Sequence, residues 1–315
     1  MLLAWGAASC ASSPKSNVEP FVDAGLDAPV EDAGEGDASC SPTEAVSGWA
    51  AWPMPDPSMA SAPNSPRYDT SSAEVVVDLL TGLAWQRAVE PAEHAWQEAK
   101  DLCDCSTLGG FDDWRLPTRI ELVSIVDFTK GGPAVDPVAF PATPSDYVWS
   151  ASRVAGTESA AWYVYFLDGN THSAGLDTPH GVRCVRATMK MTLPSPRYGV
   201  PGDGTVLDVA SMLVWQRDVD DNLRTWADAK NHCAVLSLAG GGWRLPNMKE
   251  LQALIDETAQ NPAIDTATFG DAPPESFWTS TPLAGDPTEA WFVSFYGGVA
   301  YTSTLDRMYR TRCVR

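Results

Sequence analysis

The sequence predicts an α+β fold that is built twice, each copy from two helices packed on short antiparallel strands. Three observations lead to this prediction: a tandem duplication, the same order of elements in both copies, and a matched pair of cysteines in each. The 315 residues, 44% hydrophobic and including 13 Trp, suffice for two cores. We therefore expect a first domain over 64–188 and a second over 189–315.

The duplication emerges when the chain is compared with itself at an offset of 130 residues, which a one-residue deletion later changes to 129. The repeated motifs, each given by its first residue in the two copies, are SPRY (Ser65, Ser195), WQR (Trp85, Trp215), WRLP (Trp114, Trp243) and RCVR (Arg183, Arg312). Each copy has about 125 residues, which is the size of a domain rather than of a solenoid unit.

Each copy opens with a predicted β-hairpin followed by a helix. The stretches "VVVDLLTGLAWQR" and "TVLDVASMLVWQR" have the pattern of two strands joined by a tight turn. Trp96, Ala99 and Cys103 then recur at the spacing of one helical face, and the second copy repeats them at positions 226, 229 and 233, with Thr225 as the expected N-cap. The cysteines of these helices are therefore predicted to point into a core.

A capping box predicts the start of the second helix in each copy. Thr118 precedes Glu121 by three positions, and Asn247 precedes Glu250 in the same way. These glutamates are therefore interpreted as helix-start residues rather than as catalytic acids. After a longer irregular stretch, segments such as "YVWSAS" and "AWYVYF" alternate as short strands do.

The seven cysteines indicate an oxidising compartment. Cys103 and Cys184 are 81 positions apart and Cys233 and Cys313 are 80 apart, so one disulfide within each copy is the simplest pairing. Cys40 and Cys105 remain as a third pair that would staple the preceding segment onto the first domain. A metal site is disfavoured because Cys103 and Cys105 are too close for a zinc knuckle and no His is shared between the copies.

The N-terminal stretch "MLLAWGAASC" resembles the end of a bacterial lipoprotein signal, which would make 1–10 the signal and Cys10 the lipidated residue, although a basic segment is missing. Residues 11–63 are rich in Ala, Pro and Asp and poor in large apolar residues, so a flexible, disordered acidic tether is expected. No other run is long enough to span a bilayer, and any membrane attachment is expected through the lipid alone.

The net charge of -20 argues against nucleic acid and anionic membrane surfaces as partners, because phosphate binding requires clustered Lys and Arg. The folded region alone, 65–315, holds 20 Lys and Arg against 32 Asp and Glu.

The segments "DLLTGLAWQR", "WQEAKDLC", "DWRLPTRIEL", "YVWSAS" and "GVRCVR", with their second-copy counterparts, resemble the C-terminal domain of the Legionella collagen-like adhesin. The resemblance covers about 65–315. It implies a C-type lectin-like fold, a disulfide between an early helix and the last strand, and a surface protein that binds glycans without enzyme activity. Together with the N-terminus it implies an exported lipoprotein of the outer membrane or cell surface. The sulfated glycans associated with that adhesin domain are not expected here, since the chain is acidic.

A glycan or surface-protein ligand is expected to meet loops and polar side chains of the late strands. In the first copy the stretch "LDGNTHS" offers Asp168, Asn170 and His172, which could hydrogen-bond a sugar or bind calcium through oxygens. The stretch "YGGVAYTS" of the second copy offers Tyr296 and Tyr301 instead. A plain hairpin turn is the alternative interpretation of "LDGN".

Two other functions stay open from the sequence. The first is a structural component of the cell envelope that binds protein partners. The second is an enzyme: "RLPT" followed by Glu also resembles formylglycine-generating enzymes, but their paired active-site cysteines have no counterpart here. The other acidic candidates for catalysis are the pairs Asp127 and Asp256, and Asp136 and Asp265, which are interpreted first as capping or solvated residues.

Overall fold

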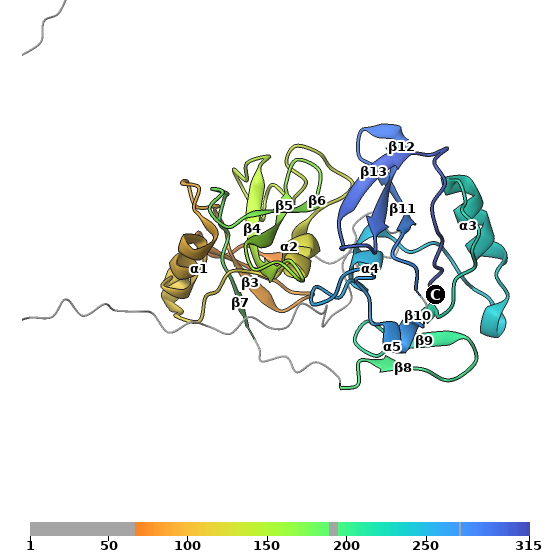
Figure 1. Ribbon diagram of the computed structural model, residues 1–315. Helices are drawn as coiled ribbons and strands as arrows, with labels where there is room; N and C mark the ends of the chain where they lie inside the picture. The colour runs from red at the N-terminus through yellow and green to blue at the C-terminus, as the bar shows by residue number, and fades with distance from the viewer. Residues whose placement is uncertain (1–66, 189–194, 271) are drawn as a thin grey trace, which may run out of the picture. The chain divides into compact units, whose positions relative to one another are not determined.

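The computed structural model describes residues 67–188, 195–270 and 272–315. The predicted signal over 1–10 and tether over 11–63, with Cys10 and Cys40, lie outside these residues. The described elements follow the same order in both copies, except for one short helix that only the second has and a last strand that only the first has, and Figure 1 shows this order by colour along the chain. Within the described residues no helix is both long and apolar enough to cross a membrane.

The elements are helices and short antiparallel strands, as an α+β fold requires. Those of the first copy are β1 (Tyr68–Asp69), β2 (Val75–Asp78), β3 (Leu83–Gln86), α1 (Trp96–Asp104), the 3₁₀ turn η1 (Leu108–Gly110), α2 (Arg119–Ile125), β4 (Tyr147–Arg153), β5 (Ala160–Tyr165), β6 (Asn170–Gly175) and β7 (Val185–Ala187). Those of the second are β8 (Tyr198–Gly199), β9 (Thr205–Asp208), β10 (Leu213–Gln216), α3 (Trp226–Val235), η2 (Leu238–Gly240), α4 (Met248–Gln252), α5 (Thr266–Phe269), β11 (Ser276–Leu283), β12 (Asp286–Ser294) and β13 (Ala300–Thr304).

The predicted hairpins are confirmed and show why SPRY is repeated. In β2–β3 the carboxylate of Asp78 accepts the backbone N–H of Leu80 at 3.0 Å, which stabilises the turn. The same carboxylate forms an ion pair with Arg67 of SPRY at 2.6 Å. Arg197 and Asp208 repeat this pair at 2.7 Å in the second copy. The motif therefore anchors the entry strand to the hairpin.

Both predicted capping boxes are confirmed, and each contains an additional ion pair. Glu121 receives the backbone N–H of Thr118 at 2.8 Å and two hydrogen bonds from Arg115 of WRLP, at 2.6 and 2.7 Å. Arg244 and Glu250 form the equivalent pair in the second copy. The repeated Trp-Arg-Leu-Pro motif thus supplies the cation that neutralises the carboxylate capping α2 or α4.

The second helix differs between the copies. α2 ends at Ile125, whereas α4 ends at Gln252, so Leu254 and Ile255 lie beyond its last residue although both are buried. The irregular stretch of the second copy contains α5, which the sequence did not predict. Asp265 caps this helix by accepting the N–H groups of the second and third residues after it.

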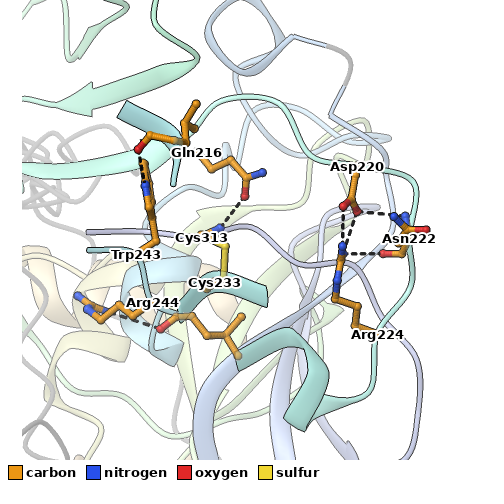
Figure 2. The surroundings of a disulfide bond; sticks show 10 residues. Gln216, Asp220, Asn222, Arg224, Cys233, Trp243, Arg244 and Cys313 are labelled. Atoms are coloured by element: carbon orange, nitrogen blue, oxygen red, sulfur yellow. Dashed lines mark hydrogen bonds and ion pairs between the residues drawn. A yellow bond between two sulfur atoms is a disulfide. The ribbon is translucent and has the colours of Figure 1, made fainter. Parts of the chain in front are cut away.

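The two predicted intradomain disulfides are formed, Cys103–Cys184 and Cys233–Cys313. Figure 2 shows the second one, where the Gln216 side chain accepts the backbone N–H of Cys313 at 3.1 Å. Cys105 is also disulfide-bonded, and its predicted partner Cys40 lies outside the described residues. Cys103–Cys184 and Cys233–Cys313 each join the first helix of a copy to the RCVR motif near its end.

The RCVR motif places a fully buried arginine next to each of these disulfides. Arg183 donates from Nη1 to the carbonyl oxygens of Gln86 and Arg87, at 2.7 and 2.8 Å. Burial lowers the pKa of its guanidinium to about 9. Arg312 makes the same two contacts with the WQR segment of the second copy. RCVR and WQR therefore repeat together because they contact each other.

The copies share one sheet, which the sequence analysis did not foresee. A six-stranded sheet has the order β11-β12-β13-β6-β5-β4, and β6 pairs with β13 at Thr171 and Ala300. One hydrophobic cluster contains buried residues of both copies, including Val164 and Val293 on this sheet. Two further clusters, one in each copy, surround the disulfides. The folded region is thus two repeats joined through a common core.

Candidate functional site

The two faces of the six-stranded sheet carry different side chains. On one face Val148, Val164 and Phe166 are fully buried in the shared core. On the opposite face the helix α1 and the disulfide cover Trp149 and Ala161 near one end of the strands. In the second copy Trp278 and Ala290 lie on this face and are buried in the equivalent cluster around the disulfide. The rest of the face carries aromatic side chains that are partly buried or exposed.

These side chains form a continuous series, which we call the aromatic row. Its members in spatial order are Tyr165, Tyr147, Tyr163, His172, Tyr301, Phe292 and Tyr309. The strand register explains the order, because Tyr147 is opposite Tyr165 and Phe292 is opposite Tyr301 on antiparallel neighbours. The row crosses the boundary between the copies.

Each ring of the row contacts the next. In the first copy the centroids of Tyr165 and Tyr147 lie 4.5 Å apart, and those of Tyr147 and Tyr163 lie 4.9 Å apart. At the boundary His172 and Tyr301 are separated by 5.8 Å. These separations are those of favourable aromatic pairs, so the rings hold one another in position.

Buried rings beneath the first-copy half keep it rigid. His180 is 7% exposed and lies 4.5 Å from Trp149 and 4.9 Å from Tyr163, measured between ring centroids. Burial lowers the pKa of His180, so its ring is neutral near neutral pH. Burial also raises the pKa of Tyr163 and Tyr301, which keeps both hydroxyls protonated and able to donate.

The repeat relates the positions of the two halves but not their chemistry. At the offset of 129, Tyr163 corresponds to Phe292 and His172 to Tyr301, so aromatic character is kept. Tyr147 and Tyr165 correspond instead to Ser276 and Ser294. Tyr147 is also 36% exposed. The first-copy half consequently offers the larger accessible aromatic surface.

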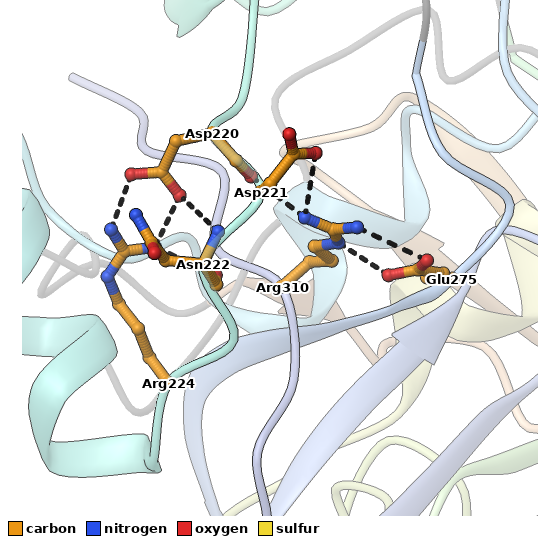
Figure 3. Close-up of polar contacts among 6 residues, drawn as sticks. All are labelled: Asp220, Asp221, Asn222, Arg224, Glu275 and Arg310. Carbon is orange, nitrogen blue, oxygen red and sulfur yellow. Dashed lines mark hydrogen bonds and ion pairs between the residues drawn. The ribbon is translucent and has the colours of Figure 1, made fainter.

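A group of ion pairs borders the second-copy end of the row, and Figure 3 shows it. Arg310 binds Glu275 at 2.5 Å and Asp221 at 3.4 Å. Arg224 binds Asp220, and this hydrogen bond is the main cause that lowers the pKa of the Asp220 carboxyl. The first copy has Gly181 and His94 in place of the two arginines. The ion pairs therefore constrain only the second-copy end.

The structure brings two of the five predicted ligand-binding residues together. His172 and Tyr301 meet at the boundary, each from a different copy. Asp168 lies in the turn before β6 and Asn170 is the first residue of that strand, and the Asp168 carboxylate accepts the Asn170 backbone N–H at 2.9 Å. Tyr296 is 60% exposed at the β12–β13 turn and makes no ring contact with another described residue.

The other members of the row were not predicted from the sequence. Tyr147, Tyr163 and Tyr165 stand at alternate positions of "YVW" and "WYVY", where the opposite face carries Val148 and Val164. This alternation of aromatic and aliphatic residues is the signal that could have revealed a second, exposed aromatic face.

The acidic candidates for catalysis serve local turns. Asp127 binds Lys130 at 2.5 Å and the Thr129 hydroxyl at 2.6 Å. Asp256 binds the Thr258 hydroxyl in the same way, and Asp136 accepts backbone N–H groups of its own loop. In the described part of the chain no three or more His, Cys, Asp or Glu side chains are grouped as metal ligands would be.

Comparison with known families agrees with this duplicated organisation. The model of the Lcl C-terminal domain matches the chain twice, over residues 74–186 and 204–315. The search of curated proteins finds no match. Because the two matches together cover more than half of the sequence and coincide with the two structural repeats, the chain belongs to the Lcl C-terminal domain family, as a tandem pair.

Proposed function

We propose that this chain is a non-enzymatic, surface-exposed binding protein that recognises a glycan on the aromatic row. Membership in the Lcl C-terminal domain family indicates a surface-associated, adhesin-like protein, and the disulfides indicate an oxidising location. The proposal further includes lectin-like recognition, lipid anchoring at Cys10 and a tether over 11–63. The observation that carries the binding role is the continuous, partly exposed row of rings.

The chemistry of the row suits a sugar. A pyranose ring has C–H groups that pack against an aromatic face, where the π-electrons carry partial negative charge, while its hydroxyls point outward to polar partners. Tyr147, Tyr163 and Tyr301 combine both requirements, because each has an apolar ring and a hydroxyl that can donate or accept. Binding surfaces rich in Tyr lose little conformational entropy, since the side chain has few rotatable bonds.

The charges near the row disfavour an anionic glycan. Burial raises the pKa of the Tyr165 hydroxyl, and the neighbouring Tyr147, Asp168 and Asp146 raise it further. Among the described residues, the cation–π contacts involve rings such as Trp162 and Trp226 but none of the row. A sulfated sugar would meet carboxylates here, and the arginines at the second-copy end, Arg224 and Arg310, are already paired with Asp220 and Glu275.

Calcium is not required by this mode of binding. The Asp168 carboxylate already serves the turn before β6, and the row itself consists of rings and hydroxyls rather than the carboxylates that calcium prefers. We expect binding to survive a chelator.

The test is a polysaccharide and glycan-array screen of the oxidised protein, run with calcium and again with a chelator. The parent protein should bind at least one uncharged glycan in both conditions, and Tyr163→Ala should reduce the affinity at least about tenfold, as the loss of a stacking contact implies. Tyr296→Ala is the matched control, because Tyr296 is exposed but apart from the row. Equal losses in both variants would contradict the placement of the site.

Absence of glycan binding in both conditions would overturn the proposed function. The remaining candidate would then be an envelope component whose exposed aromatic face binds a protein partner.

A further inference from the structure

At the boundary between the copies, residues at equivalent positions of the two repeats are direct neighbours. Thr171 and Ala300, which pair across it, are separated by 129 positions and so correspond in the repeat. The neighbouring residues His172 and Tyr301 also correspond and are in ring contact. The two halves of the row therefore meet at the same structural position, approached from opposite sides.

Buried contacts beneath the sheet hold the halves together. Arg119 of the first copy binds Glu257 of the second at 2.8 Å, and its side chain is 1% exposed. Lys249 of the second copy donates to the Ser124 carbonyl oxygen of the first at 2.9 Å. If the copies shifted against each other, these charged groups would lose their partners while still shielded from water, which is costly. The halves of the row are thus fixed in register.

From this geometry, and resting on the proposed glycan-binding function, we infer that both copies bind one and the same linear polysaccharide without acidic groups, laid across the strands. All rings of the row except Tyr309 lie on β4, β5, β6, β13 and β12, so four interstrand spacings separate Tyr147 on β4 from Phe292 on β12, or about 19 Å. A disaccharide cannot span this distance. A linear chain can place successive sugar rings over successive strands.

Because the two halves of the row differ, the two copies should contribute differently to binding of the polysaccharide. Short oligosaccharides should occupy the first-copy half, where Tyr147 and Tyr165 enlarge the aromatic surface. Longer chains should cross the boundary at His172 and gain contacts with Tyr301 and Phe292. Affinity is therefore expected to depend on chain length until the row is filled.

The test is calorimetric titration of the full oxidised chain with β-1,4-linked glucose and N-acetylglucosamine oligomers, from dimer to hexamer, with heparin as the anionic comparison. For the sugar that binds, we expect affinity to rise at least tenfold from trimer to hexamer. Tyr301→Ala should abolish most of that rise and leave trimer affinity within about twofold, whereas Tyr301→Phe should restore the rise. Thermal unfolding of each variant would establish that it is folded.

The outcomes separate the two proposals. If every uncharged oligomer and polymer fails to bind, the proposed function itself fails. If trimer and hexamer bind equally well, or if Tyr301→Ala weakens the trimer as much as the hexamer, glycan binding stands and the shared, boundary-crossing site is wrong. Tighter binding of heparin than of every uncharged chain would also contradict the inference, because it would require a cationic site.

Discussion

The buried ion pair at the boundary between the copies allows a test of whether the copies share one core. Arg119 and Glu257 have side chains that are 1% and 8% exposed, with 2.8 Å between Nε and Oε1. Arg119 also donates to the Gly298 carbonyl oxygen at 2.5 Å and lies over the Trp162 ring. At the offset of 129 the corresponding residues are Met248 and Phe128. Phe128 packs against Trp291, 5.4 Å away between ring centroids. Met248 and Phe128 both belong to the shared hydrophobic cluster, so the positions equivalent to the ion pair are occupied by buried apolar residues.

The perturbation is to replace Arg119 and Glu257 by the apolar residues of the equivalent positions. Arg119→Met alone leaves a buried carboxylate without its cation, and Glu257→Phe alone leaves a buried guanidinium without its anion. Each single substitution should lower the free energy of unfolding by about 3–5 kcal/mol, as breaking a buried pair does. The double variant leaves no buried charge unpaired and should cost only about 1–2 kcal/mol, mainly for the Gly298 carbonyl oxygen that loses its donor.

The assay is urea unfolding of the oxidised variants, followed by tryptophan fluorescence and far-UV circular dichroism. The prediction is that the double variant is more stable than either single variant. A double-mutant cycle with Glu275→Gln and Arg310→Ala is the matched control, because the Glu275 side chain of that ion pair is 46% exposed. The interaction energy between these two side chains should be below about 1 kcal/mol. Additive effects at the boundary, or single losses below about 1 kcal/mol, would refute the reasoning, because water would then reach the pair and the copies would not share a core.

Three further predictions concern single elements. Replacing Cys103 and Cys184 together by Ala should cost up to about 4.5 kcal/mol, since the bond closes a loop of 81 positions, and thermal unfolding would measure it; a loss below about 1 kcal/mol would contradict the loop-closure argument. Glu121→Gln should destabilise more than Glu250→Gln, because Arg115 is 5% exposed and Arg244 is 37% exposed; equal losses in urea unfolding would argue against it. Burial lowers the pKa of His180 in the folded protein, so as the pH falls the unfolded chain binds a proton at this residue before the folded chain does. His180 should therefore destabilise the fold increasingly as the pH falls below 6.5. His180→Tyr, which copies Tyr309 of the second repeat, should show a smaller loss of urea midpoint between about pH 7 and about pH 5 than the parent; an unchanged pH dependence would exclude this role.

Local patterns were sufficient to predict most elements of each copy, with the short helix α5 as an exception. Thr118 and Glu121 specify a helix start through side-chain contacts three residues apart, and this box is formed. The matched spacing of the cysteines predicted the Cys103–Cys184 bond, because a duplicated core requires the same pairing in both copies. These features depend on neighbours in sequence or on the repeat itself.

The joining of the copies could not be predicted in this way. Arg119 stands directly after the cap Thr118, where a charged residue usually faces solvent, yet it is buried against Glu257 of the other copy. Lys249 occupies the equivalent first turn of α4 and is also fully buried. Such burial follows from the pairing of β6 with β13, and neither strand carries a local signal that identifies its partner.

The candidate site was predicted only in part for a related reason. Polar residues in a turn drew attention to Asp168 and Asn170, whereas the row is assembled from strands of both copies. His172 and Tyr301 were chosen independently, and only the structure brings their rings together. The repeated motifs WRLP and RCVR, which are the most conspicuous in the sequence, stabilise the fold. The proposed binding residues are those in which the copies differ, as Tyr147 and Ser276 do.

The most direct test of the binding surface is hydroxyl-radical footprinting by mass spectrometry, with and without the polysaccharide identified in the screen. We predict that Tyr147 in the first copy and Tyr301 in the second lose reactivity together when the ligand is bound, while the exposed Tyr296 keeps its reactivity. Protection of Tyr296 with no change at Tyr147 and Tyr301 would contradict the account and place the binding surface at the turns instead of the aromatic row.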